Sequence, residues 1–269
     1  MSKNDLSALT ANKNMNRFSW RRVGMVGDYY WPRLRLQVLL YPLASLVVFF
    51  LIMATRHDAD MALEARSSLT NLLTYAVMFA PVVLAMRPGC YMTDTMLPAR
   101  GAEKSVYLLF YFLIVVPVLG FVPVDVLSLV FFGHTVMFNF TDLSMVTDYI
   151  GDDGVWMVRM FNIVCLYVAI TTCLWAVVTS RRNGVVKGVL IPLIPAFVVS
   201  FVMAGYIVAQ LTGIAGANSV TLHSGDVMVM TDKVIDSMMR SMSVFIPILI
   251  AYVVVAIIGI SRAISRRTA

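Results

Sequence analysis

Long apolar runs separated by short polar segments dominate the chain from residue 34 onward. Hydrocarbon offers no partner for backbone N–H and C=O groups, so apolar runs of about 20 residues favour membrane-spanning helices. The pattern predicts six such helices. Their expected ranges are 34–54, 69–86, 105–123, 155–178, 185–211 and 242–260. The sequence therefore predicts an all-α, polytopic membrane protein.

The third apolar run is longer than one span requires, because it extends over 106–140. Two packed spans would need roughly 17 residues each, and the second half is too short for that. We expect the span to end near Pro123 and a short helix over 126–132 to lie in or dip into the outer interface. Asp125 would then sit among lipid headgroups. If the span continued, Asp125 would be an intramembrane carboxylate and a functional candidate.

Basic residues favour one side of the predicted membrane. Most of the 21 Lys and Arg residues lie before the first span, after spans two and four, and in the tail. The positive-inside rule then places both termini in the cytoplasm. Most acidic residues fall in the opposite loops. A basic face against anionic lipid accounts for the net charge of +6, so no nucleic-acid partner is required.

Composition agrees with membrane insertion. The chain is 59% hydrophobic and 13% charged, with a mean hydropathy of +0.82, whereas soluble domains are about 25% charged. We expect a cytoplasmic amino-terminal segment over 1–33, a six-span domain over 34–262 and a basic cytoplasmic tail over 263–269. The first 30 or so residues lack the apolar core of a cleavable signal peptide. The first span is expected to act as the insertion signal.

The segment before the first span combines aromatic residues and arginines at helical spacing. The residues that characterise it are Trp20, Arg21, Arg22, Tyr30 and Trp31. Trp20, Tyr30 and Trp31 are expected on one stripe. This composition suits the headgroup region, so we expect an interfacial helix that leads through Trp31 and Pro32 into the first span. The alternative is a basic flank without fixed structure, because two glycines weaken its helix propensity.

Signatures of catalysis and metal binding are missing from the sequence. It contains no phosphate loop, no HExxH helix and no GxSxG elbow. His57, His134 and His223 all fall in expected outer loops, where solvated side chains are favoured over a metal site. Methionines over 228–242 could bind Cu(I) but are better explained as a packing face. We expect no catalytic residue, no metal and no cofactor.

A few polar residues lie within the apolar runs. The candidates are Asp125, Asn162 and Gln210, with Thr171 and Thr172 nearby. Such side chains line an internal path or join helices by hydrogen bonds. Joining helices is the favoured role for most of them.

The polar stretch over 87–104 predicts a compact helical elbow on the cytoplasmic side. Pro88 and Gly89 end the second span, and a short helix over 91–96 can follow. A break at Leu97, Pro98 and Ala99 precedes the third span. Glu103 falls in the first turn of that span, where a carboxylate suits the helix dipole.

The Leu97-Pro98-Ala99 stretch followed by Glu103-Lys104, together with Phe18-Ser-Trp-Arg-Arg, resembles the bacterial permease-like proteins of the type-2 ABC exporter family. The resemblance implies a basic amphipathic helix before six spans, and a short helix between spans two and three that docks onto a separate ATPase. It also implies outer re-entrant helices over 214–240. The residues it assigns to the ATPase-coupling loop are Tyr91, Asp94, Met96, Leu97, Pro98, Glu103 and Lys104.

Two functions follow as expectations. The first is the permease subunit of an ABC-type exporter in the cytoplasmic membrane of a bacterium, working as a homodimer or with a second permease. The second is a membrane assembly or regulatory protein without a transport path, which the scarcity of charge inside the spans favours. An intramembrane enzyme would need a nucleophile–base pair or a metal cluster, and the sequence shows neither.

Overall fold

The protein is a bundle of long helices. The computed structural model describes residues 18–54, 72–86, 99–132, 144–180, 183–217 and 224–268, and the regular elements within these residues are all helical. Five of the described helical segments are long and apolar enough to cross a membrane. They are Trp20–Leu51, Gly101–Leu127, Gly154–Thr179, Gly184–Val202 and Asp236–Arg266. The chain is therefore an all-helical protein of the polytopic membrane type.

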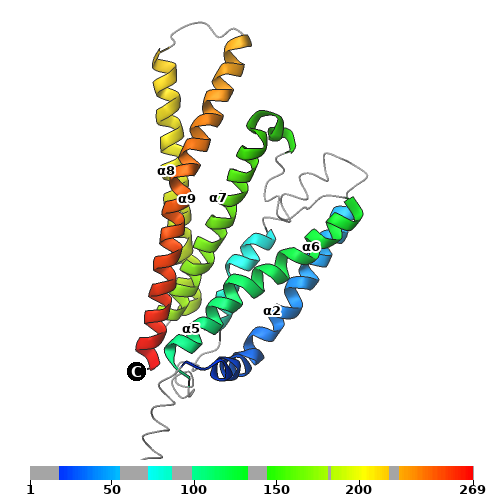
Figure 1. Ribbon diagram of the computed structural model, residues 1–269, viewed down its shortest axis with the longest axis vertical. Helices are drawn as coiled ribbons and strands as arrows, with labels where there is room; N and C mark the ends of the chain where they lie inside the picture. Colours follow the sequence, from blue (N-terminus) through cyan, green and yellow to red (C-terminus); the bar gives the residue numbers. More distant parts are fainter. Residues whose placement is uncertain are drawn as a thin grey trace, which may run out of the picture.

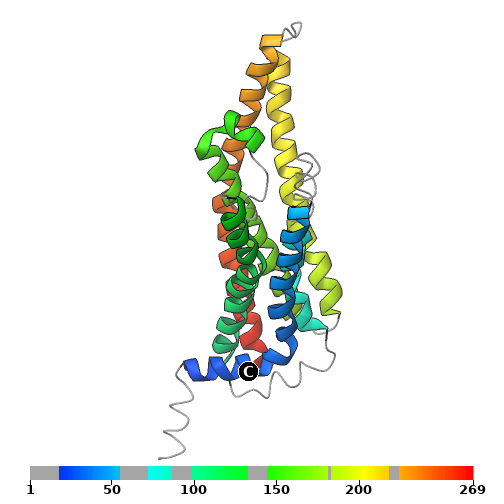
Figure 2. The same ribbon diagram turned by 90° about the vertical axis from the view of Figure 1, so that its right-hand side faces the viewer.

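The first helix, α2 (Trp20–Ala54), changes direction along its length. Its first turns lie across the lower end of the bundle, and the rest runs upward (Figure 2). Pro32 lies within α2 and explains the bend, because a proline removes one helical hydrogen bond and displaces the preceding turn. One buried stripe follows the whole helix at spacings of three and four residues. It consists of Val26, Tyr30, Leu34, Gln37, Tyr41, Ser45 and Phe49.

The second expected span is not a continuous helix. Residues 72–78 are α-helical, Phe79 forms a turn, and η2 (Ala80–Ala85) is a 3-10 helix. Pro81 lies in the first turn of η2, where its missing N–H removes one backbone hydrogen bond. Ala80, Pro81 and Val82 are buried. The expectation of a regular span over 69–86 was wrong for the part that the structure describes.

The third expected span is longer than expected. It consists of α5 (Gly101–Phe110), a π-helical turn η3 (Tyr111–Val115) and α6 (Val116–Phe132), which follow one another without a break. The expectation of a separate helix over 126–132 was wrong, because α6 passes through Pro123 and continues to Phe132. A single proline costs one backbone bond there, and neighbouring groups tolerate this within a packed bundle. The apolar segment that could cross a membrane ends at Leu127.

The carboxyl-terminal half forms a group of three long helices. These are α7 (Ser144–Thr179), α8 (Gly184–Ala217) and α9 (Ser224–Thr268). The central one is α7, which packs against both α8 and α9 (Figure 1). Within the described part of 214–240, the expected re-entrant helices do not appear as separate elements, since residues from Ser224 onward already belong to the continuous α9.

From α6 onward, successive long helices run in opposite directions, so the chain returns repeatedly to the same end of the bundle. At the lower end of the bundle in Figure 1, α2 and α5 begin, α7 and α8 meet, and α9 ends. We call this the lower end, and the opposite end the upper end. The described segments for which the sequence predicts a cytoplasmic location are thus gathered at one end of the molecule.

Candidate functional site

A buried ion pair lies at the lower end, where α2 and α5 begin. The side chain of Glu103 is completely buried, at 0% exposure. Its Oε1 lies 2.8 Å from Nη2 of Arg22 and 2.9 Å from Nε of Arg22. The same Nε lies 3.0 Å from Oε2. The guanidinium therefore contacts both carboxylate oxygens, the geometry in which arginine pairs most strongly with a carboxylate.

Two backbone groups complete the coordination of this carboxylate. The N–H of Ser19 donates to Oε1 at 2.9 Å, and the N–H of Arg100 donates to Oε2 at 2.9 Å. Ser19 directly precedes α2, and Arg100 is the N-cap residue of α5. One carboxylate thus satisfies an unpaired donor at the start of each helix, where four N–H groups lack partners. We call Ser19, Arg22, Arg100 and Glu103 the Glu103 junction.

The end of α9 packs directly against the Glu103 junction. A Cβ atom on Gly101 would lie 2.5 Å from Cα of Ser265 and 2.9 Å from its backbone nitrogen. The two backbones therefore touch, and no side chain fits between them at this point. Lys104, which follows Glu103, is only 2% exposed. The first turn of α5 is consequently enclosed by α2 on one side and α9 on another.

The residues assigned to the coupling loop fall into two groups. Tyr91, Asp94, Met96, Leu97 and Pro98 lie outside the described residues. Glu103 and Lys104 are described, and both are buried. They are therefore not part of an exposed docking surface, and Glu103 instead fixes the position of the helix that follows the loop.

Some of the residues assigned to the interfacial helix are exposed, and others point into the bundle. Trp20 and Trp31 are 73% and 50% exposed, and Arg21 is exposed, as expected for side chains that meet headgroups. Arg22 is turned inward to Glu103. Tyr30 does not share the tryptophan stripe, because it is buried and stacks on Tyr107 at a centroid distance of 6.1 Å. The Arg22–Glu103 pair was not foreseen, since its members are 81 residues apart.

Polar side chains of α2 bond to the backbone around the broken second span. Nε2 of Gln37 donates to the carbonyl of Ala80 at 2.8 Å, and the hydroxyl of Tyr41 donates to the carbonyl of Ala76 at 3.1 Å. In a membrane, non-helical backbone is tolerated only where protein or water satisfies its polar groups. These two side chains supply such bonds from within the bundle.

These bonds lead to a prediction about stability. Changing Gln37 to Leu leaves the buried carbonyl of Ala80 without this donor, but it also removes the amide oxygen of Gln37, which is buried without a hydrogen-bond partner within the described residues. The net cost is expected to be about 1 kcal/mol of unfolding free energy. Changing Tyr41 to Phe removes only a hydroxyl and is expected to cost about 1 kcal/mol. Thermal unfolding of the purified protein in mild detergent measures both. Changing exposed Arg35 to Ala, on the same helix, serves as a control. Equal melting temperatures for the parent and the Gln37→Leu variant would contradict the assignment.

The intramembrane polar candidates lie on three different helices. Asp125 on α6 is 5% exposed and is therefore buried in the protein, two residues before the end of the apolar segment Gly101–Leu127. Asn162 on α7 is half-buried. Gln210 belongs to α8, but its side chain lies outside the described part of the structure. The hydroxyl oxygens of Thr172 and Tyr252 are 2.8 Å apart, which joins α7 to α9 in the expected manner.

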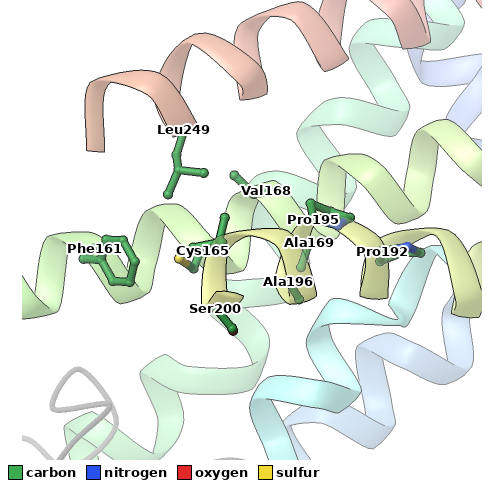
Figure 3. A pocket seen from close by; sticks show the side chains of 10 residues that line it. Phe161, Cys165, Val168, Ala169, Pro192, Pro195, Ala196, Ser200 and Leu249 are labelled. Atoms are coloured by element: carbon green, nitrogen blue, oxygen red, sulfur yellow. The ribbon is translucent and has the colours of Figure 1, made fainter. Parts of the chain in front are cut away.

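An apolar cavity of about 230 Å³ lies between α7, α8 and α9. Phe161, Cys165 and Val168 of α7 line it, Pro192 and Pro195 lie on α8, and Leu249 comes from α9 (Figure 3). Ser200 adds one hydroxyl to its wall. The lining suits a hydrocarbon group better than a charged one, because it offers few partners for polar atoms.

The metal hypotheses receive no support from the described residues, among which no group of three His, Cys, Asp or Glu side chains could hold an ion. His57, His134 and His223 lie outside the described ranges. Met242 is buried, which fits its expected role in packing.

Comparisons with protein families, with curated proteins and with solved structures gave no match. The function has to be argued from the residues of this chain.

Proposed function

We propose that this chain is the membrane-spanning permease subunit of an ABC-type exporter, driven by a separate ATPase that docks at the lower end. In this proposal the chain has six spans with both termini in the cytoplasm, and it resides in the cytoplasmic membrane of a bacterium. It works as a homodimer or with a second permease. The observation that carries the proposal is the Glu103 junction.

The Glu103 junction offers a route for transmitting force. The elbow over 91–96 precedes α5, so an ATPase that displaces the elbow would pull on Arg100 and the first turn of α5. Because Glu103 binds Arg22 and the N–H of Ser19, this movement would carry the first turns of α2 with it. Backbone contact between Gly101 and Ser265 would extend the movement to α9. Close packing of this kind transmits displacement instead of absorbing it.

Prolines supply positions at which the helices could change shape. Pro32 and Pro42 interrupt the bonding of α2, Pro192 and Pro195 that of α8, and Pro247 that of α9. A proline within a helix removes a backbone bond and permits bending. The helix α7 contains no proline. Bending of the other helices around α7 would expose an apolar path alternately to the two sides of the membrane. The cavity lining favours a lipid or a hydrophobic peptide as cargo.

The alternative is a non-transport assembly or regulatory protein that recruits partners through its lower end. It is favoured by the small number of charged residues buried within the described helices, namely Glu103, Lys104 and Asp125. Two of these lie in the first turn of α5 and not at mid-span. Ion-coupled transporters generally bury charges along their path, so this scarcity weighs against an ion-coupled path.

Affinity purification of the tagged protein in mild detergent, from cells that express its native neighbours, tests the proposal. We expect an ATPase to co-purify in a fixed ratio and to be lost when residues 91–96 are replaced by a Gly-Ser linker. Changing Arg22 to Ala is expected to preserve this association and to lower ATP hydrolysis by the complex, because only the N–H of Ser19 then links Glu103 to α2. Changing exposed Arg35 to Ala is the matched control. A preparation that contains no ATPase would favour the alternative.

A further inference from the structure

A second cavity, of about 150 Å³, lies between the third helical run and α7. Its lining is apolar except for one phenol, and includes Leu113, Pro117, Phe121, Ile163, Leu166 and Tyr167. The π-helical turn η3 contacts α7, and above this contact α6 and α7 lean apart toward the upper end (Figure 1). An apolar cavity of similar volume can hold a benzene-sized hydrocarbon group. The pocket is therefore large enough for part of an acyl chain.

Arg159 of α7 lies one helical turn before Ile163, which lines this cavity. The two residues are four positions apart, so their side chains lie on the same face. Helical side chains point back toward the amino terminus of their helix, which directs Arg159 toward the upper end. Its Nε is shielded from solvent and has no hydrogen-bond partner within the described residues. Trp156, three residues earlier, is 63% exposed.

This order of side chains matches the order of groups in a phospholipid. Tryptophan and arginine are typical of the headgroup level of a membrane, and a guanidinium binds phosphate through two parallel hydrogen bonds. The apolar cavity follows one to two turns deeper, where an acyl chain would lie. Asp125 lies one turn beyond Phe121 on α6, but its side chain is buried in the protein, so it does not compete with the phosphate as a surface charge.

We propose that the surface formed by Trp156, Arg159 and this cavity binds an anionic phospholipid of the leaflet at the upper end. Its phosphate rests on Arg159, and the first carbons of one acyl chain fill the space between Phe121 and Leu166. The anionic headgroup is preferred to a zwitterionic one, because the ammonium of a zwitterionic lipid offsets the attraction of its phosphate to Arg159. This site is separate from the Glu103 junction and does not depend on the exporter proposal.

Fluorescence quenching in vesicles tests the site. The full-length protein is reconstituted in phosphatidylcholine vesicles that contain a small fraction of lipid with brominated acyl chains, either phosphatidylglycerol or phosphatidylcholine. The contribution of Trp156 is the difference between the parent and a Trp156→Phe variant. We expect brominated phosphatidylglycerol to occupy the site about five-fold more than its bulk fraction, the factor expected for one basic residue near an anionic lipid.

Matched variants decide the outcome. Arg159→Gln should remove the preference, and Arg159→Lys should retain part of it. Ile163→Phe, which fills the cavity and leaves the charge in place, should also lower it. Arg240→Gln should leave it unchanged, since Arg240 is an exposed arginine of α9 paired with Asp236 at 2.7 Å. Each variant is included only if it elutes at the same volume as the parent protein in size-exclusion chromatography. Equal quenching by the two lipids in the parent, or a preference that survives in Arg159→Gln, would overturn the proposal.

Discussion

Changing Glu103 to Ala is expected to lower the free energy of unfolding by about 3–5 kcal/mol, the cost typical of removing one partner from a buried ion pair. The change leaves the guanidinium of Arg22 without its carboxylate and removes the acceptor for the N–H groups of Ser19 and Arg100. It therefore loosens the starts of α2 and α5 together. Thermal unfolding in mild detergent measures the loss.

A double-mutant cycle separates the ion pair from the backbone bonds. Arg22→Ala combined with Glu103→Ala should cost clearly less than the sum of the two single variants, because the second change removes a charge that the first has already left unpaired. Arg21→Ala, which alters an exposed arginine next to Arg22, should change stability by less than about 0.5 kcal/mol. Additive single effects would contradict direct pairing between Arg22 and Glu103.

Changing Gly101 to Val is also expected to destabilise the lower end of the bundle. Its Cβ would lie 2.5 Å from Cα of Ser265, a separation that forces α5 and α9 apart, and overpacking usually costs about 1–3 kcal/mol, sometimes more. Because the obstacle is backbone, Ser265→Gly should not rescue the variant. Thermal unfolding in mild detergent measures the destabilisation.

A second glycine provides the control for helix propensity. A Cβ atom added to Gly24 in α2 would meet no neighbouring side chain or other helix within 4 Å. Gly24→Ala should therefore be neutral or should stabilise the helix by up to about 1 kcal/mol. If Gly101→Ala behaved in the same way as Gly24→Ala, α5 and α9 would not be in backbone contact at the lower end.

The sequence did not show which of two prolines interrupts a helix. Pro81 and Pro123 both lie within apolar runs of suitable length, and each removes one backbone donor. The structure breaks the helix at Pro81 but continues α6 through Pro123. The difference lies in the surroundings, because Gln37 and Tyr41 reach across from α2 to bond the carbonyls near the break. Nothing in the sequence next to Pro81 indicates those partners.

The site residues were predicted unevenly for a related reason. Glu103 was recognised from its place in the first turn of a span, which is a local property. Its partner Arg22 was assigned to the membrane surface, because arginines beside tryptophans are typical of headgroup contacts. The helix before Asp125 was expected to end at Pro123, whereas α6 continues and Asp125 is buried in the protein. In both cases the sequence did not indicate which neighbours the side chain meets.

The sequence by itself determined that this is an all-helical protein of the membrane type, and it located the long apolar helices, although the described helices extend beyond the expected ranges at one end or both. Those properties depend on the length and composition of each run, since each segment must satisfy its own backbone in hydrocarbon. Only the tertiary structure decided that Arg22 meets Glu103, that Gly101 touches Ser265 and that the second span is broken. These features depend on contacts between residues far apart in the chain, and such contacts form only when the helices pack.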